Sequence, residues 1–259
     1  MIRTIARHKL TKFSHSRMIL IFVLAGLFIG LIVFLPVIVS KAMAPGMPIG
    51  GGVAATYFDI VEFFGAAVAL VLGVLMWRQD AKDGTLSIFL ARPISRTALL
   101  AGKLLGSIYA LLLFLGITLL VYFAAHLLLL SYDIPLVFLL YLVQVMVKWL
   151  VILSFGLAFS SLVNSLLAAV LVIGYFTLGT IGKIVLAFPS RWTQVPAKII
   201  KVLVMDIDKG CQPETVLLTD MSSLSPLLIG IAYYALWSVM LLSLSIILFS
   251  RREFSGSRT

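Results

Sequence analysis

A short polar stretch interrupts the chain at residues 83–96, where the sequence is DGTLSIFLARPISR. Long apolar runs lie on both sides of it, near 57–77 and 97–128. A bilayer core about 30 Å thick is crossed by a helix of about 20 apolar residues, and both runs reach that length. The stretch therefore indicates a connection between two membrane-spanning helices, and the fold depends on how often such runs recur.

Six apolar runs of this length occur in the 259 residues, of which 62% are hydrophobic and 12% charged. Soluble domains are about half apolar and about a quarter charged, so this composition predicts an integral membrane protein. The predicted fold class is all-α, with one transmembrane domain over 1–259. The expected spans are 19–40, 57–77, 97–128, 136–162, 166–187 and 225–249. The third and fourth exceed the bilayer thickness, so we expect them to tilt or to project into the cytoplasm.

The first run has a second interpretation, as a signal peptide, because basic residues precede it and the small residues of KAMA follow at 41–44. Its apolar stretch of about 20 residues is longer than the roughly 7–15 of a signal sequence, so we expect an uncleaved helix.

Basic residues favour one side of the membrane. Of the 20 Lys and Arg residues, five lie in 1–18, five in 78–103 and three after residue 250, and a six-span topology puts these segments on one side. The positive-inside rule predicts both termini and the 78–96 stretch in the cytoplasm. We expect the membrane to be the cytoplasmic (inner) membrane of the cell. The net charge of +10 is then explained by loops beside anionic headgroups, with no nucleic acid partner.

Three connecting segments have distinct patterns. Residues 1–18 mix apolar and basic side chains, which fits either a disordered tail or, as we prefer, an amphipathic helix at the cytoplasmic interface. PAKIIKVLVMD, at 196–206, starts with a proline suited to a first helical turn and predicts a short helix at the outer leaflet before the last span. A polar turn at Asn164 and Ser165 predicts that the fourth and fifth spans form an antiparallel hairpin.

The 83–96 stretch also has a helical pattern of its own. Asp83 can cap a helix, Gly84 permits the turn into it, and Pro93 ends it. Its apolar side chains share one face: Leu86, Phe89 and Leu90. A helix of about two turns is unstable alone, so it must dock on the membrane surface and neighbouring helices or on another protein.

Extended to DGTLSIFLARPISRTALLAGKLLG at 83–106, this region resembles the signature between the second and third spans of ABC-2-type permeases, the membrane subunits of ABC exporters. The matching positions are Gly84, Thr85, Leu86, Leu90, Arg92, Pro93, Ser95, Arg96, Gly102 and Lys103. One position departs from the pattern, because Lys82 stands where family members often carry Glu. Any ATPase contact made by that carboxylate is altered or moved in this chain.

The resemblance implies that residues 84–92 form a coupling helix that docks on a separate ATPase subunit. The residues assigned to that contact are Asp83, Gly84, Thr85, Leu86, Phe89, Leu90, Arg92, Pro93 and Arg96. It also implies a homodimer of permeases, with ATP and Mg held by the ATPase and no cofactor on this chain. Gly26 and Gly30, spaced as G-x-x-x-G on the first span, are candidates for the dimer contact.

The sequence has no sign of chemistry of its own. It contains no G-x-x-x-x-G-K-[ST] phosphate loop and no H-E-x-x-H motif, its three histidines are scattered, and Cys211 is its one cysteine. We therefore predict no enzyme activity, no catalytic residue and no metal site. The alternative to a permease is a non-transporting membrane scaffold or a channel-like subunit.

Charged residues inside spans are costly and mark candidate functional positions. Asp59 and Glu62 are expected near the outer end of the second span, with Lys183 at a similar depth in the fifth. A Glu62–Lys183 pair would avoid unpaired charges, either as a structural contact or beside the substrate exit path. Lys148, inside the fourth span, has three possible roles: it reaches the headgroups, faces the subunit interface or lines the substrate path.

Overall fold

The computed structural model describes residues 18–43, 52–76, 96–129, 137–186 and 224–251, together with Gln212, Pro213 and Val216. The helices in these residues are α2 (Met18–Met43), α3 (Gly52–Leu75), α6 (Arg96–Leu129), α7 (Val137–Leu162), α8 (Ser165–Leu186) and α11 (Leu224–Arg251). The all-α prediction is confirmed for this part of the chain. The predicted interfacial helix (1–18, apart from its last residue), the coupling helix (84–92) and the outer-leaflet helix (196–206) lie outside it.

Five of these helices are long and apolar enough to cross a membrane: α2, α3, α6, α7 and α11. The apolar stretch recognised in α8 is shorter, Ser165–Leu178, so a sixth span there stays a prediction. The helix bounds follow the predicted spans closely except at α3, which begins at Gly52 instead of near residue 57. This earlier start matters for the site, because it moves Glu62 away from the helix end.

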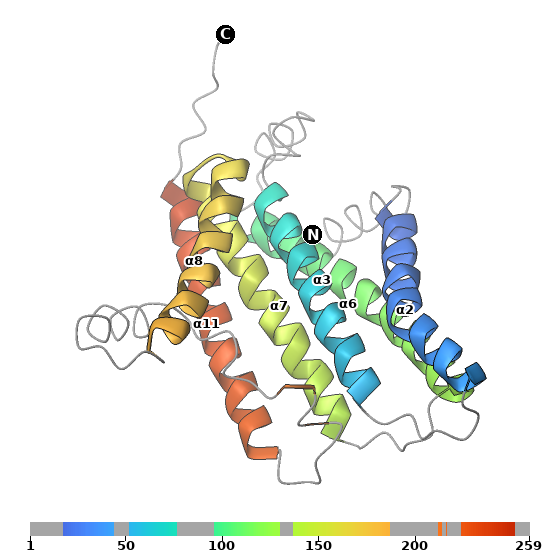
Figure 1. The fold of residues 1–259 in the computed structure, drawn as a ribbon. Coiled ribbons are helices and arrows are strands. Elements are labelled where there is room, and N and C mark those ends of the chain that lie inside the picture. Colours follow the sequence, from blue (N-terminus) through green and yellow to red (C-terminus); the bar gives the residue numbers. More distant parts are fainter. Residues whose placement is uncertain are drawn as a thin grey trace.

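Successive helices alternate in direction (Figure 1). The first residues of α2 and the last residues of α11 lie at the same end of the bundle, together with the turn between α7 and α8. That turn is as tight as predicted: the amide of Val163 donates to the carbonyl of Phe159 at 3.0 Å, and the amide of Ala168 donates to the carbonyl of Asn164 at 2.8 Å. The bond from Val163 thus closes α7 and the bond to Asn164 opens α8, as an antiparallel hairpin requires.

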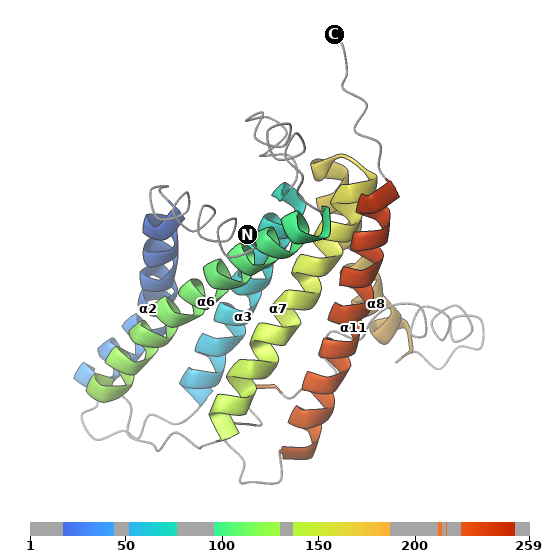
Figure 2. The same cartoon turned by 180° about the vertical axis from the view of Figure 1, so that it is seen from behind.

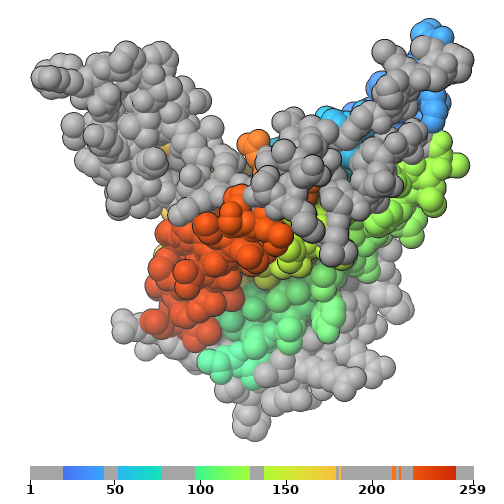
Figure 3. All heavy atoms as spheres, turned by 90° about the horizontal axis from the view of Figure 1, so that it is seen from below, coloured from blue at the N-terminus to red at the C-terminus, as the bar shows by residue number. Residues whose placement is uncertain are grey.

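The longest helix, α6, has 34 residues and a length of ~51 Å at 1.5 Å per residue. Figure 2 shows it inclined across the back of the bundle relative to α3 and α7. Its atoms also adjoin those of α11, as the green and orange spheres in Figure 3 show. The incline accommodates a helix that is longer than the hydrocarbon core.

Two apolar clusters hold the bundle together. The larger joins α2, α3, α6 and α7 with Leu227 of α11, and it includes the fully buried rings of Tyr57, Tyr122 and Trp149. The smaller joins α7, α8 and α11 around Phe155 and Tyr234. Helix α7 supplies buried residues to both clusters and packs on α3, α6, α8 and α11, so it is the central helix of the described bundle.

The outward faces of the helices are also apolar. On α2, Leu24, Phe28 and Leu31 are each more than half exposed. Exposed apolar surface of this extent is unfavourable in water and is the normal surface of a helix in lipid.

Helices α3 and α7 approach closely enough for their backbones to touch. A Cβ atom on Gly73 would overlap the carbonyl oxygen of Leu153 and would lie 3.2 Å from the Cα of Gly156. Ser160 Oγ donates to the carbonyl of Gly73 at 3.4 Å, one turn further along α7. Small residues permit this approach, which maximises packing where the hydrophobic effect between helices is absent.

Candidate functional site

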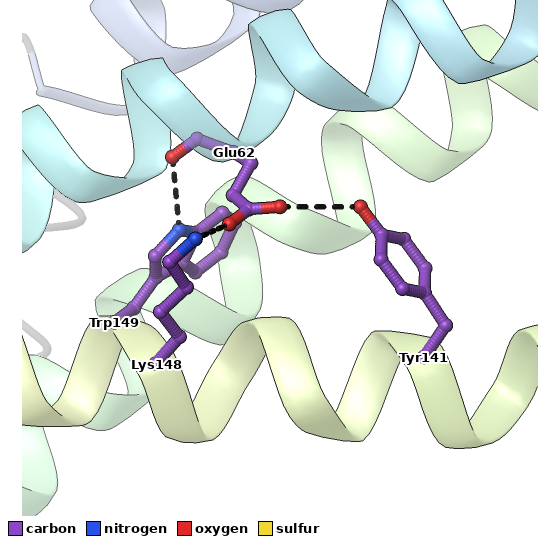
Figure 4. Close-up of polar contacts among 4 residues, drawn as sticks. All are labelled: Glu62, Tyr141, Lys148 and Trp149. Atoms are coloured by element: carbon purple, nitrogen blue, oxygen red, sulfur yellow. Dashed lines mark hydrogen bonds and ion pairs between the residues drawn. The ribbon is translucent and has the colours of Figure 1, made fainter. Parts of the chain in front are cut away.

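An ion pair joins the two central helices. The ammonium of Lys148, on α7, donates to Oε1 of Glu62, on α3 (Figure 4). Each side chain is 16% exposed, so the pair is largely withdrawn from the surface but still reaches it.

The pair lies near the middle of both helices. Glu62 is ~15 Å from the start of α3 at Gly52 and ~20 Å from its end at Leu75, at 1.5 Å per residue. Lys148 occupies a similar mid-helix position in α7. The sequence had suggested that Glu62 lies near the outer end of its span, and the early start of α3 corrects this. A charge at this depth is costly unless it is paired, which the contact with Lys148 achieves.

Two aromatic residues of α7 fix Glu62 in place. The hydroxyl of Tyr141 donates to Oε2 of Glu62 at 3.3 Å, and the indole Nε1 of Trp149 donates to the Glu62 backbone carbonyl at 3.1 Å. Figure 4 shows Tyr141 and Lys148 approaching the carboxylate from opposite sides. Side chain and backbone of Glu62 are therefore both held by α7.

The local sequence of both helices explains this arrangement. Tyr141 and Lys148 are seven residues apart, about two helical turns, so they share the face of α7 that meets α3. Gly65 lies nearly one turn after Glu62, and a Cβ atom there would overlap the indole ring of Trp149. The absence of a side chain at Gly65 thus makes room for the tryptophan, whose ring also packs against Phe114 of α6.

The partner of Glu62 is therefore Lys148, where the sequence had suggested Lys183. The reason is packing: α7 lies along α3 and presents Lys148 at the depth of Glu62. Lys183 is part of α8, and its side chain lies outside the described residues. Lys148 does not extend to the headgroups, which was one of its three suggested roles, because its ammonium pairs with Glu62.

The two glycines assigned to a dimer contact also need correction. Gly26 and Gly30 are buried against α6 of the same chain. A Cβ atom on Gly26 would lie 3.1 Å from Cγ2 of Ile117, and one on Gly30 would lie 2.6 Å from Cγ1 of Val121. Their small size serves an intrachain helix contact, so a dimer would need another surface. A homodimer itself stays a prediction.

The predicted ATPase contact cannot be placed on the described residues. Asp83, Gly84, Thr85, Leu86, Phe89, Leu90, Arg92 and Pro93 lie outside them, and Arg96 is placed only as the first residue of α6. The segment that contains them connects the end of α3 to the start of α6.

Sequence reasoning missed Tyr141 and Trp149. The seven-residue spacing between Tyr141 and Lys148 was a signal for the first, because it places a hydroxyl on the same helical face as the charge. Nothing comparable indicated that Trp149 would reach the backbone of α3. In the part of the chain that the structure describes, no group of three His, Cys, Asp or Glu side chains could hold a metal ion.

The arrangement can bind charge. It presents a fixed carboxylate, a hydroxyl and a cation on a flexible stem, near the middle of both helices and at the edge of the protein surface.

Comparison with known proteins agrees with the membrane architecture. A family model described as ABC-2 family transporter protein matches residues 4–254. The match covers the 83–96 stretch and both helices that carry the ion pair. No match to a curated protein was found.

Proposed function

The chain belongs to the ABC-2 family of transporter proteins, and on that premise we propose that it is the permease of an ATP-driven exporter that works with a separate ATPase subunit. The observation that carries the proposal is the family match, which spans residues 4–254 of a chain of 259. The multi-pass helical bundle supports it. Two permeases and two ATPases would make the complete exporter, with ATP and Mg bound by the ATPases. The protein would lie in the cytoplasmic membrane with both termini inside.

The helix contacts support a route for the coupling motion. The 84–92 segment would dock on the ATPase and move when ATP binding closes the ATPase pair. It follows α3, and α3 is fixed to α7 by the Glu62 contacts and by the backbone contact at Gly73. Helix α7 in turn packs on α11. A push on the segment would therefore displace these three helices together.

The test of coupling is a pull-down from the native host. The wild-type protein, solubilised in mild detergent, is expected to retain a soluble ATPase. Phe89→Asp is expected to lose it, because a charge replaces the apolar centre of the docking face. Ser87→Asp, which adds the same charge outside that apolar face, is the matched control and is expected to keep the ATPase.

Two outcomes would count against the proposal. Failure to recover an ATPase with wild type, even after mild crosslinking, would favour the scaffold or channel-like alternative. Equal ATPase recovery with Phe89→Asp and with wild type would show that the 84–92 segment is not the docking element. The direction of transport follows from uptake of substrate into inside-out membrane vesicles, which an exporter performs when ATP is added outside.

A further inference from the structure

The two charges of the Glu62–Lys148 pair lie equally deep on their helices. Lys148 is ~16 Å from the start of α7 at Val137 and ~21 Å from its end at Leu162, at 1.5 Å per residue. The corresponding distances for Glu62 on α3 are ~15 Å and ~20 Å. Each side chain is 16% exposed. Neither side chain is long enough to carry its charge to a headgroup, and both reach the protein surface at the same level.

Both members of the pair keep unused hydrogen-bonding capacity. An ammonium can donate several hydrogen bonds and a carboxylate can accept several. Among the described residues, the ammonium of Lys148 donates to Glu62, and the carboxylate of Glu62 accepts from Lys148 and Tyr141. The remaining donors and acceptor sites are available to a ligand that reaches the exposed part of the pair. Such a ligand would gain contacts that hydrocarbon cannot supply.

The charge of a suitable ligand follows from the equal depth of the two groups. A ligand with one positive charge would compete with Lys148 for Glu62 and leave the ammonium without a full counter-charge. A ligand with one negative charge would do the same to Glu62. A ligand that carries both charges can lie antiparallel to the pair, with its cation beside the carboxylate and its anion beside the ammonium. All four charges are then compensated, and the contact between Glu62 and Lys148 is kept.

Polar side chains on α3 provide an approach to the pair. Thr56 and Asp59 are both exposed, ~6 Å and ~10 Å from the start of the helix at Gly52, and Glu62 follows nearly one turn later. Ionisable side chains inside a membrane span are costly and are candidates for a substrate pathway. A polar headgroup that moves inward from the Gly52 end would therefore find successive hydrogen-bonding partners before it meets the pair.

The depth of the pair indicates that the rest of the ligand is apolar. Helices α3 and α7 are both long and apolar enough to cross a membrane, and the pair lies near the middle of each. A ligand has to enter the hydrocarbon core to reach it. Hydrocarbon groups on the ligand favour that transfer out of water.

We propose that the Glu62–Lys148 pair binds the headgroup of a zwitterionic amphiphile, in which an ammonium and a phosphate or carboxylate are attached to a hydrocarbon chain. The ammonium of the ligand contacts Glu62, and its anionic group contacts Lys148. Tyr141 orients the carboxylate, and Trp149 holds the α3 backbone that carries it. The proposal assigns a substrate class to the exporter and in that respect rests on the proposed function.

The test is equilibrium binding of three radiolabelled amphiphiles to the purified protein in dodecyl maltoside, an uncharged detergent. Dodecyl phosphoethanolamine is zwitterionic, dodecyl phosphate is anionic and dodecylamine is cationic, and all three have the same hydrocarbon chain. No ATPase and no ATP are present, and protein-free micelles correct for partition into detergent. Wild type is expected to bind the zwitterion saturably and at least ~10-fold more tightly than either singly charged compound.

Three variants test whether this preference arises at the pair. Glu62→Gln leaves the ammonium and is expected to prefer dodecyl phosphate. Lys148→Met leaves the carboxylate and is expected to prefer dodecylamine. Glu62→Gln/Lys148→Met leaves no ion and is expected to bind the three compounds with the same low affinity. A loss of folding cannot switch the preference in opposite directions, and the double variant keeps the test decisive if a single variant is too unstable to purify.

Three results would overturn the proposal: equally tight binding of the zwitterion and a singly charged compound by wild type, a preference for the zwitterion that survives in the double variant, or single variants that show no opposite switch. The assay is independent of the pull-down. Recovery of an ATPase without the preference would refute the substrate class and keep the exporter. A preference that depends on the pair, without any ATPase, would keep the site and refute the exporter.

Discussion

The contact between α3 and α7 at Gly73 allows a quantitative prediction for Gly73→Ala. The added methyl group would overlap the carbonyl oxygen of Leu153 and crowd the Cα of Gly156. These are backbone atoms, which cannot rotate away as a side chain could. Overpacking of this kind costs about 1–3 kcal/mol, and the rigid neighbours place Gly73→Ala at the upper end. Replacing glycine by alanine in a helix gains about 1 kcal/mol, so the expected net destabilisation is about 2 kcal/mol.

The matched control is Gly116→Ala in α6. Nothing lies within 4 Å of a Cβ atom at that position, so the change should gain helix propensity and meet no neighbour. Both variants add one methyl group to a helical glycine, and their difference of about 3 kcal/mol isolates the contact. Gly156→Ala should fall between them, because its nearest contacts, at 3.2 Å, are crowded without overlapping.

The assay is thermal unfolding of the three variants and wild type in one detergent, followed by circular dichroism. A change of 1 kcal/mol shifts the midpoint of a chain this size by about 2–4 °C, so Gly73→Ala should melt about 6–12 °C below Gly116→Ala. Equal midpoints for these two variants would refute the inference that the α3 and α7 backbones are in contact.

Three further changes test other contacts. Lys148→Met alone should destabilise the protein by about 3–5 kcal/mol, and adding Glu62→Gln should restore most of it, which a double-mutant cycle of unfolding free energies would measure. A double variant less stable than either single one would contradict the pairing. Tyr57→Phe should cost about 1 kcal/mol, seen as a lower melting midpoint, because its hydroxyl donates to a backbone carbonyl of α6 at 2.7 Å. If α2 lies at a homodimer interface, a cysteine at the exposed Phe28 should crosslink two copies and one at the buried Gly26 should not, as gel electrophoresis would show; the reverse pattern would restore the glycine contact.

Hydropathy was sufficient to predict most of the fold. A stretch of about 20 apolar residues has few alternatives to a membrane helix, because every backbone polar group must be satisfied within the segment. The predicted spans therefore agree with the observed helices to within a few residues, apart from the early start of α3. The hairpin at Asn164 could also be predicted from the sequence, because two long apolar helices joined by a few polar residues can only run antiparallel.

The candidate site was only half predictable. The sequence marked Glu62 and Lys148, because an ion inside an apolar span is conspicuous whatever surrounds it. It did not predict that they meet, and it directed attention to Lys183 instead. The cause is the composition of α7, which is apolar on nearly every side and so gives no periodic pattern to distinguish a protein-facing surface from a lipid-facing one.

For Gly26 and Gly30, too, the sequence predicted one part of the contact and the structure decided the other. Their spacing predicted that α2 is closely approached by another helix, and this is what the structure contains. Which helix approaches is a property of the packed bundle, and the tertiary structure assigns α6 of the same chain to that face. The sequence by itself determined the number of apolar segments, their lengths and the presence of buried charge, because each depends on local composition. Only the tertiary structure decided which charge neutralises Glu62 and which backbones touch at Gly73, because both depend on distances between helices that are far apart in sequence.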